Sequence, residues 1–394
     1  MKIIYTGAFR FPDKDAASQR VLNNAKILRS LGHEVIFYGW EQKEREEDYI
    51  AEQGYFYQGF EYKSMNELDK EQKSLSSKIM GFLTKGQHTL EQIKKTIGNE
   101  SPDLIIVYNS HYLFIRSMLK FTKASGLKLV VDCTEWYESS HLPGGKYGLP
   151  SIDNYLRMHC INKKVGNIIA ISSYLEEYYK KSRANTVCLP PLIDLDEQKW
   201  QTDVLTKAFS DEVHLIYAGE PGNKDLLTGV IDALTKANQS SGRKIVFNIL
   251  GSGKEQILKV LNIKNLPDNV NCLGRIKMEE VPKAYAKNHF SVLIREDKRY
   301  AHAGFSTKFV ESLTCGIPVI ANSTSDIPNY LKDGQNGYLL QGNSLDELVS
   351  VFERIKVLSN EEYEVMKTEA KKTSQRFFDY NNYKNNTKEF LNTI

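Results

Sequence analysis

A glycine-bearing loop followed by a helical pattern, between residues 303 and 320, carries the clearest chemical signal in this sequence. Gly304 lets the backbone approach a ligand closely, and Ser306 or Thr307 is suited to cap the helix that follows. The start of such a helix offers unpaired N–H groups and the positive end of the helix dipole. Because Lys308 adds a cation beside them, the segment predicts a diphosphate site.

Glu311 follows about one helical turn later, where its carboxylate is placed to accept hydrogen bonds from sugar hydroxyls. Phe309 and Leu313 fall at helical spacing and predict the buried face of this helix. Gly316 ends the helix, and Pro318 opens the next apolar run. Loop and carboxylate together predict a nucleotide-sugar ligand.

Short apolar runs alternate with helical patterns along the chain and position these residues. They lie at residues 2–7, 34–38, 104–108, 127–131, 167–171, 213–219, 244–250, 270–273, 290–294 and 318–321. This alternation is typical of mostly parallel sheets with both faces covered. We therefore expect an α/β fold with two Rossmann-like domains whose sheets face a central cleft, where ligands bind at the carboxyl ends of the strands.

Chain length and a pair of prolines predict the domain boundaries. A chain of 394 residues exceeds one ordinary hydrophobic core. Pro190 and Pro191 end regular structure, and a polar stretch follows. We expect an N-terminal, acceptor-side domain over 1–195, a donor-side domain over 196–370, and a C-terminal helix over 371–394 that packs back on the first domain.

Two polar residues that follow N-terminal strands, His111 and Glu135, are candidates for catalysis. Either is suited to orient an acceptor hydroxyl or the reacting sugar. Asp132, Trp136 and Tyr137 surround Glu135 in the sequence, and such polar and aromatic clusters suit sugar binding. For His111, an ordinary position on a surface loop is the competing interpretation.

The composition of the chain indicates which partners and which cellular location to expect. The net charge is +3 and no segment is a dense block of Lys and Arg with interleaved aromatics, so we expect no nucleic-acid partner. Five scattered cysteines without metal-like spacing indicate reduced thiols. The sequence shows neither a signal-peptide core nor a membrane-spanning run, so we expect a cytoplasmic protein.

The Lys-, Ser- and Gln-rich stretch from about residue 65 to 95 has two interpretations. It is compatible with a basic amphipathic helix that contacts the inner face of a membrane. The simpler interpretation is a solvated helix on the outer face of the domain.

The pattern G-F-x-x-x-x-x-E-x-x-x-x-G-x-P-V-I, which begins at Gly304, resembles the donor-binding signature of the retaining glycosyltransferases of family 4. These enzymes have the two-Rossmann-domain GT-B fold. Further segments resemble the family in the same order, at 20–35, 167–174, 189–194, 217–225, 250–253, 272–275 and 330–340. The resemblance therefore covers nearly the whole chain.

The resemblance implies a role for particular residues toward the donor. Glu311 corresponds to the carboxylate that holds the ribose hydroxyls, and Lys224 to a phosphate-binding lysine. Arg275 follows the strand that borders the nucleobase. The loops implied to surround the donor contain Gly7, Ala17, Ser18, Gly219, Gly251, Gly304, Phe305, Ser306, Thr307 and Lys308.

Two departures from the family pattern concern charged positions. Ala303 stands where the first Glu of the signature is expected, and Glu220 stands where an Arg usually pairs with the diphosphate. We expect Arg295 to replace the missing cation and Glu296 or Asp297 to replace part of the missing carboxylate. A solvated charged loop at 295–297 is the competing interpretation.

The activity implied by the resemblance is transfer of a hexose or N-acetylhexosamine, with retention, from a nucleotide diphosphate sugar. UDP is the favoured nucleotide, and neither a metal nor another cofactor is expected. The implied acceptor is a glycan, a lipid-linked sugar or a protein, in the synthesis of bacterial cell-surface polysaccharide or glycoconjugates. Two alternatives remain open: a degenerate subunit that stabilises a partner transferase, and a sugar-nucleotide epimerase or phosphorylase.

Overall fold

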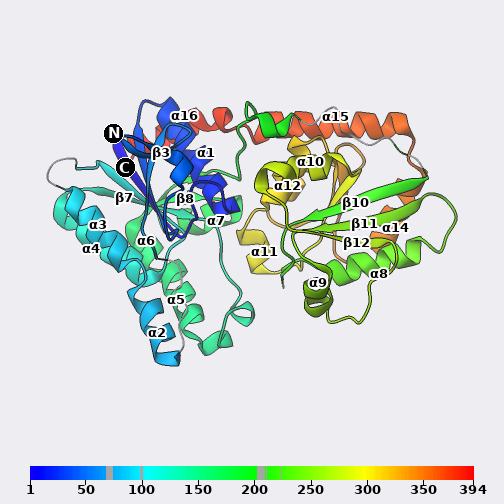
Figure 1. Cartoon of the computed structure of the whole chain (residues 1–394), viewed down its shortest axis with the longest axis horizontal. Coiled ribbons are helices and arrows are strands. Elements are labelled where there is room, and N and C mark those ends of the chain that lie inside the picture. The colour runs from blue at the N-terminus through cyan, green and yellow to red at the C-terminus, as the bar shows by residue number, and fades with distance from the viewer. Residues whose placement is uncertain (68–73, 98–100, 202–208, 210, 223) are drawn as a thin grey trace. The chain divides into compact units, whose positions relative to one another are not determined.

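The computed structural model of the protein describes residues 1–67, 74–97, 101–201, 209, 211–222 and 224–394 (Figure 1). The chain forms two compact units, Met1–Leu192 with Tyr383–Ile394, and Ile193–Asn382. The first boundary thus follows residue 192 rather than 195. The second follows residue 382 rather than 370, because α15 (Asn360–Phe377) runs without a break through residue 371.

A nine-stranded sheet forms the centre of the first unit, as far as its residues are described. Its order is β3-β4-β5-β2-β1-β6-β7-β8-β9, and neighbours from β5 to β9 pair in parallel. The bounds are β1 (Lys2–Gly7), β2 (Glu34–Gly39), β3 (Tyr49–Ile50), β4 (Gly54–Tyr57), β5 (Phe60–Ser64), β6 (Leu104–Tyr108), β7 (Lys128–Cys133), β8 (Asn167–Ala170) and β9 (Asn185–Cys188). All five predicted runs of this half are strands.

The strands β3, β4 and β5 form an antiparallel extension of the sheet that the apolar pattern did not predict. They are short and mix Tyr and Phe with Gly and charged residues, so neither strict alternation nor a continuous apolar run marks them.

The helices of the first unit follow the strands in the way that parallel sheets require. The bounds are α1 (Ala16–Ser30), α2 (Leu75–Thr84), α3 (Gln87–Thr96), α4 (Tyr112–Ser125), α5 (Leu149–Leu156), α6 (Asn162–Val165), α7 (Ser173–Lys180) and α16 (Lys384–Asn392). A π-helical turn, Arg157–Ile161, joins α5 to α6. The C-terminal helix α16 packs against α1 and β9.

A six-stranded, all-parallel sheet forms the centre of the second unit, within its described residues. Its order is β12-β11-β10-β13-β14-β15. The strands are β10 (Glu212–Ala218), β11 (Lys244–Leu250), β12 (Val270–Gly274), β13 (Phe290–Leu293), β14 (Val319–Asn322) and β15 (Gly337–Leu340). The predicted runs of this half are strands, and β15 adds one to them.

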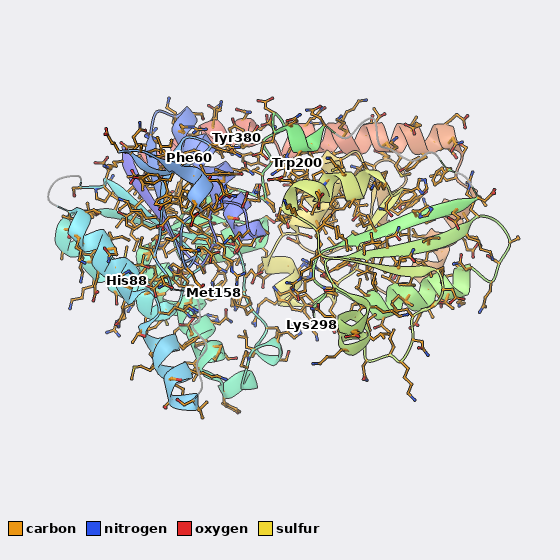
Figure 2. All side chains as sticks on the ribbon, viewed as in Figure 1. Phe60, His88, Met158, Trp200, Lys298 and Tyr380 are labelled. Atoms are coloured by element: carbon orange, nitrogen blue, oxygen red, sulfur yellow. The ribbon has the colours of Figure 1, made fainter. Side chains whose placement is uncertain are left out.

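Helices pack on this sheet and bury a large apolar core, whose side chains are drawn in Figure 2. The bounds are α8 (Leu227–Ala237), α9 (Lys254–Leu261), α10 (Val281–Ala286), α11 (Arg299–Ala303), α12 (Thr307–Thr314), α13 (Ile327–Tyr330), α14 (Leu345–Val357) and α15. The helix predicted after the glycine loop is α12, and Gly316, with a φ of 69°, ends it in the left-handed region. Both sheets confirm the expected α/β fold class, whereas the cleft between the units stays a prediction.

The stretch from 65 to 95 contains two different helices, and its residues 68–73 lie outside the described residues. The helix α3 buries Leu90 and Ile93, as a solvated surface helix does. The helix α2, in contrast, has no buried residue among its ten described positions. No helix in the described parts of the chain is long and apolar enough to cross a membrane.

Candidate functional site

Two glycines at the carboxyl ends of β10 and β11 let the chain turn tightly there. Gly219 and Gly251 have φ values of 144° and 111°. A Cβ on Gly219 would lie 2.4 Å from Cε of Lys308, and one on Gly251 would lie 2.5 Å from the carbonyl carbon of Gly219. Glycine is therefore required at both positions, and at Gly219 it makes room for the Lys308 side chain.

Lys308, from the first turn of α12, lies in a cluster of charged groups at this edge of the sheet. Its Nζ donates to the hydroxyl of Tyr217 at 2.8 Å and to Oδ2 of Asp225 at 3.1 Å. Nε of Arg295 lies 2.9 Å from Oδ1 of the same Asp225. Two of the three cations predicted for the diphosphate, Lys308 and Arg295, are thus brought together, and one carboxylate binds them both.

Burial and charge set the protonation of this cluster. Burial opposes ionisation of Asp225, but Lys308 and Arg295 outweigh it and hold the pKa of Asp225 well below its usual range. Burial lowers the pKa of Lys308, and the Asp225 carboxylate opposes that shift. Asp225 was not predicted from the sequence, although it directly follows Lys224 after a strand end. Lys224 itself is half-buried in the same loop.

The loop before α12 differs in part from the prediction. The amide of Gly304 donates to the carbonyl of Tyr300 at the end of α11, so it is not an unpaired donor. Phe305 is buried among Phe309, Tyr330 and Phe378, with ring centroids 5.8 to 6.0 Å away. Its side chain is therefore part of the core, and only its backbone remains available to a ligand.

Ser306 stands at the N-cap of α12 but makes no side-chain capping bond. Its hydroxyl is buried and has no hydrogen-bond partner in the described parts of the chain, and the same is true of Ser252, after β11. Thr307 is the first residue of α12. An unpaired buried hydroxyl costs about 1–3 kcal/mol, which a bound ligand would recover.

Glu311 is half-buried on α12, and burial raises its pKa to about 7, while Lys199 and Lys308 oppose the rise. Ala303 is fully buried at the end of α11. The nearby acids have local partners instead: Glu296 lies 2.8 Å from Nζ of Lys298, and Asp297 pairs with His302.

The second departure, Glu220, pairs with the residue predicted to border the nucleobase. Its Oε1 lies 3.0 Å from Nη2 of Arg275, and Gln256 donates to it at 2.6 Å. Both charged side chains are largely exposed. The negative charge of Glu220, beside the strand ends, is therefore paired with the positive charge of Arg275.

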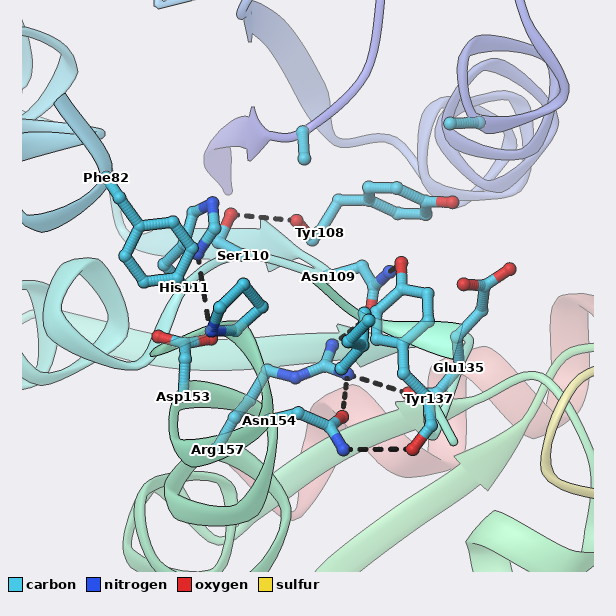
Figure 3. A pocket seen from close by; sticks show the side chains of 14 residues that line it. Phe82, Tyr108, Asn109, Ser110, His111, Glu135, Tyr137, Asp153, Asn154 and Arg157 are labelled. Carbon is cyan, nitrogen blue, oxygen red and sulfur yellow. Dashed lines mark hydrogen bonds and ion pairs between the residues drawn. The ribbon is translucent and has the colours of Figure 1, made fainter. Parts of the chain in front are cut away.

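A pocket of about 360 Å³ in the first unit brings together three further predicted residues (Figure 3). Ala17, His111 and Glu135 all line it, and they come from α1 and from the ends of β6 and β7. Its volume suits a small ligand. The imidazole of His111 stacks on Trp40 with an interplanar angle of 6°, and its Nδ1 lies 3.6 Å from Oδ2 of Asp153.

The floor of this pocket is organised by Arg157, a buried residue of the π-helical turn that the sequence did not single out. Its guanidinium donates to Oδ1 of Asn109, to the carbonyl oxygen of Glu135 at 2.9 Å and to Oδ1 of Asn154 at 3.1 Å. Asn109 has a φ of 36° and donates to the hydroxyl of Tyr137 at 3.3 Å. Burial and the neighbouring Glu135 raise the pKa of Tyr137.

Several residues predicted to bind sugar or phosphate also have structural roles. Ser18 is fully buried, and its hydroxyl forms the α1 capping box with Asp15. Gly7 is buried with its φ at 133°, and a Cβ there would lie 2.3 Å from the carbonyl oxygen of Tyr108. Asp132 forms a buried ion pair with Arg20, 2.7 Å from Nη2.

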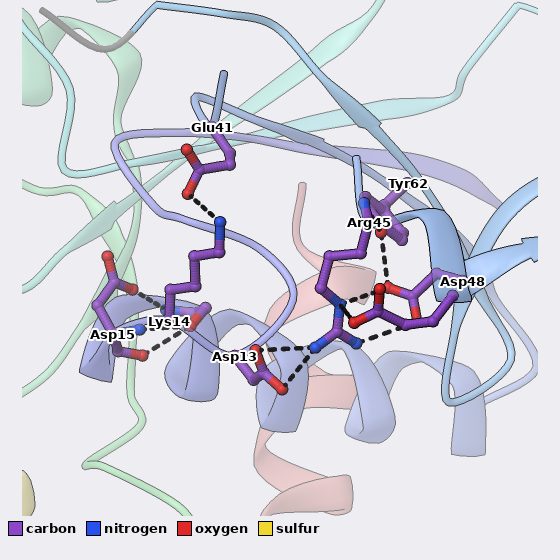
Figure 4. Close-up of polar contacts among 9 residues, drawn as sticks. Asp13, Lys14, Asp15, Glu41, Arg45, Asp48 and Tyr62 are labelled. Carbon is purple, nitrogen blue, oxygen red and sulfur yellow. Dashed lines mark hydrogen bonds and ion pairs between the residues drawn. The ribbon is translucent and has the colours of Figure 1, made fainter. Parts of the chain in front are cut away.

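Trp136 is buried against Tyr178, with ring centroids 4.6 Å apart, so it does not face the pocket as a stacking platform. The loop before α1 is itself fixed by ion pairs (Figure 4). Nη1 of Arg45 lies 3.0 Å from Oδ2 of Asp13, and Nζ of Lys14 lies 3.1 Å from Oε2 of Glu41.

The sequence and the structure were compared with protein families and with known proteins. Residues 200–373 match the family model described as glycosyl transferases group 1. This segment is a group 1 glycosyltransferase domain. It lies within the second unit and contains the glycine turns, the Asp225 cluster and Glu311.

An uncharacterized glycosyltransferase of Methanocaldococcus jannaschii is 23% identical over 199 residues, which cover 48% of each chain. The chain spans about half the length, or less, of the curated relatives that it matches. Sucrose-phosphate synthase from Thermosynechococcus elongatus superposes with a TM-score of 0.71 at 14% identity, covering 100% of this chain and 98% of that one.

Anabaena HepE, in a complex with UDP and glucose, superposes with a TM-score of 0.69 at 14% identity and full coverage of both chains. Such structural matches show that the chain has the GT-B fold, with two Rossmann-like domains.

Proposed function

We propose that the protein is a retaining family 4 glycosyltransferase that moves a hexose or N-acetylhexosamine from a UDP-sugar to an acceptor. The observation that carries the proposal is the pair of cations, Lys308 and Arg295, beside the start of α12 in a group 1 domain. The complexes of HepE with UDP and glucose and of TarM from S. aureus with UDP support the choice of nucleotide.

The second unit would bind the donor. The start of α12 together with Lys308 and Arg295 would neutralise the departing diphosphate, in place of a metal ion. Glu311 would accept hydrogen bonds from the ribose, with Lys224 near the phosphates and Arg275 near the base. The unpaired hydroxyls of Ser252 and Ser306 would gain partners.

The pocket of the first unit would bind the acceptor. Asp153 is placed to orient His111 through Nδ1, which leaves Nε2 toward an acceptor hydroxyl. Glu135 would bind other hydroxyls of the acceptor. We further propose a cytoplasmic location and a role in cell-surface polysaccharide or glycoconjugate synthesis.

Binding of UDP tests the donor site directly. We expect UDP to raise the unfolding temperature, because a ligand at 100 times its Kd adds about 2.7 kcal/mol to the folded state. Lys308→Met should abolish most of this shift. Lys236→Met is the matched control, since Lys236, on α8, forms an exposed ion pair with Asp346 at a distance of 3.2 Å. No UDP shift in the unsubstituted protein would contradict the proposal.

Turnover separates the alternatives that remained open. UDP release from one of a panel of UDP-sugars, increased by an acceptor, supports a transferase. Conversion of one free UDP-sugar into another without an acceptor supports an epimerase. Binding of UDP without any turnover indicates a degenerate subunit.

A further inference from the structure

The first unit carries an exposed apolar surface, formed by α2 and by the segment 142–155. On α2, Leu75 is 75% exposed and Met80 is 60% exposed. On the second segment, Tyr147 is 85% exposed and Tyr155 is 59% exposed. In Figure 1 both parts lie at the lower end of the unit, and Figure 2 shows the side chains of α2 projecting there.

This surface is unusual for a helix in water. An ordinary surface helix buries an apolar stripe, and a ten-residue helix is marginal without such packing. None of the ten described residues of α2 is buried, whereas the next helix, α3, buries Leu90 and Ile93. Phe82 packs on His111, with ring centroids 4.6 Å apart, but Leu75 and Met80 of α2 stay largely exposed.

The charges near this surface indicate the kind of partner. Residues 74–84 and 142–155 contain Lys78 and Lys146, and Lys85 follows α2 directly. Their one acidic residue, Asp153, is turned toward His111 and accepts from the amide of Tyr112 at 2.8 Å. Exposed apolar side chains among lysines fit the interface of an anionic lipid bilayer, where apolar groups enter the boundary and lysines face the headgroups.

The surface is continuous with the pocket of the first unit. Phe82 of α2 and Leu142 and Pro150 of the second segment all line that pocket, together with His111 and Glu135. A group bound in the pocket therefore adjoins Phe82 of α2, which Figure 3 shows beside His111.

We propose that this surface docks on an anionic membrane and that the acceptor is a lipid-linked sugar. Its polar head enters the pocket, and its lipid chain stays in the bilayer beneath α2. The choice of acceptor rests on the proposed transferase function, whereas the docking does not.

Vesicle sedimentation of the full chain tests the docking. We expect binding to equimolar phosphatidylglycerol and phosphatidylcholine vesicles, and weaker binding to phosphatidylcholine alone. Leu75→Ser with Met80→Ser should weaken binding about tenfold or more, because each apolar side chain transferred from water contributes on the order of a tenfold change. Val357→Ser with Val365→Ser is the matched control, since these valines of the second unit are 77% and 63% exposed.

Three results would overturn the docking. One is no binding of the unsubstituted protein to the anionic vesicles, and another is an equal loss in the control pair. The third is self-association that the α2 pair abolishes, without vesicle binding, which would assign the surface to a second copy of the chain. UDP release from a donor sugar without acceptor should be unchanged in the α2 pair, so failure of docking is distinguishable from failure of the transferase.

The product tests the acceptor class. Membrane vesicles from the source cells are incubated with the protein and the radiolabelled UDP-sugar that it hydrolyses. Label in the organic extract, reduced about tenfold in the α2 pair, supports a lipid-linked acceptor. Label confined to aqueous polymer or to protein contradicts it.

Discussion

In the second unit, the cations Lys308 and Arg295 are held by a carboxylate, Asp225, at distances of 3.1 and 2.9 Å. In the first unit, the buried cation Arg157 is held by neutral acceptors, which are two asparagine side chains and a backbone carbonyl. The two arrangements suit different tasks. An anionic ligand can replace the carboxylate as a partner of the two cations, whereas the neutral hydrogen-bond acceptors around Arg157 fix the shape of its pocket.

Among these variants, Arg157→Leu is expected to lower the free energy of unfolding most. It leaves three acceptors of the pocket floor without their donor, at about 1–3 kcal/mol for each buried acceptor. We therefore expect a loss of about 3 kcal/mol or more in the free energy of unfolding, measured with urea. Arg116→Leu, at an exposed position of α4, is the control. An equal loss in both variants would show that Arg157 does not organise the pocket.

Asp225→Asn tests whether the Asp225 carboxylate competes with an anionic ligand for Lys308 and Arg295. Removing one partner of a buried ion pair leaves uncompensated charge, so we expect a loss of about 2 kcal/mol in stability at neutral pH. UDP should bind several-fold more tightly, because Lys308 and Arg295 no longer have an internal carboxylate. Asp333→Asn, which breaks an exposed pair with Arg354 at 3.1 Å, should change neither quantity. Weaker UDP binding to Asp225→Asn would indicate that Asp225 positions the cations rather than competing for them.

The same residue predicts an acid dependence of stability. The pKa of Asp225 is lower in the folded protein than in the unfolded chain. Its contribution is therefore complete above the unfolded value, near 3.8, and is lost as the pH falls below it toward the folded value. Asp225→Asn should remove this part of the acid sensitivity in urea unfolding curves measured from pH 5 downward.

Glu311 should make the free energy of unfolding depend on pH in the opposite direction. Its folded pKa of about 7 lies above the ordinary value of 4.5, so its contribution to stability is complete below 4.5 and is lost as the pH rises through 7. Since the ionised form is the better acceptor for ribose hydroxyls, UDP should bind more tightly at pH 8 than at pH 6. Glu311→Gln should remove both dependences, which calorimetry can measure, and Glu353→Gln, on α14, should retain them.

The two regions also differ in how far the sequence predicts them. The loop, α12 and its terminating Gly316 are contiguous, so propensity and helical spacing were sufficient to predict them. The strand ends of the parallel sheets were predictable for the same reason, so His111 and Glu135, which follow β6 and β7, were singled out, and both line one pocket. Ala17 was expected at the donor instead, and the sequence did not predict that it lines the same pocket. Roles within the donor site were less predictable. Phe305 and Ser18 were expected in ligand-binding loops, but the side chain of Phe305 is buried in the core and that of Ser18 forms the capping box of α1.

Arg157 and Asp153 could not be predicted as site residues. They lie within helical sequence without a motif, and only the packing of α5 and the π-helical turn against α4 brings them to the pocket. Asp225 gave a weak signal as the residue after Lys224. Its ability to bind two cations depends on Lys308, 83 residues further along the chain.

The smallest effect is expected where charges meet in solvent, at Glu220 and Arg275. Exposed pairs contribute about 0–1 kcal/mol, so Glu220→Gln should change the free energy of unfolding by less than about 1 kcal/mol. Its effect on UDP should be larger than its effect on stability, because it removes a negative charge beside the donor and releases Arg275 from its 3.0 Å contact. Tighter UDP binding at low salt, which fades at high salt, would show that Glu220 weakens the donor site through its charge. Unchanged binding at both salt concentrations would mean that Arg275 neutralises Glu220 fully, and that the departure from the family pattern is compensated within the unit.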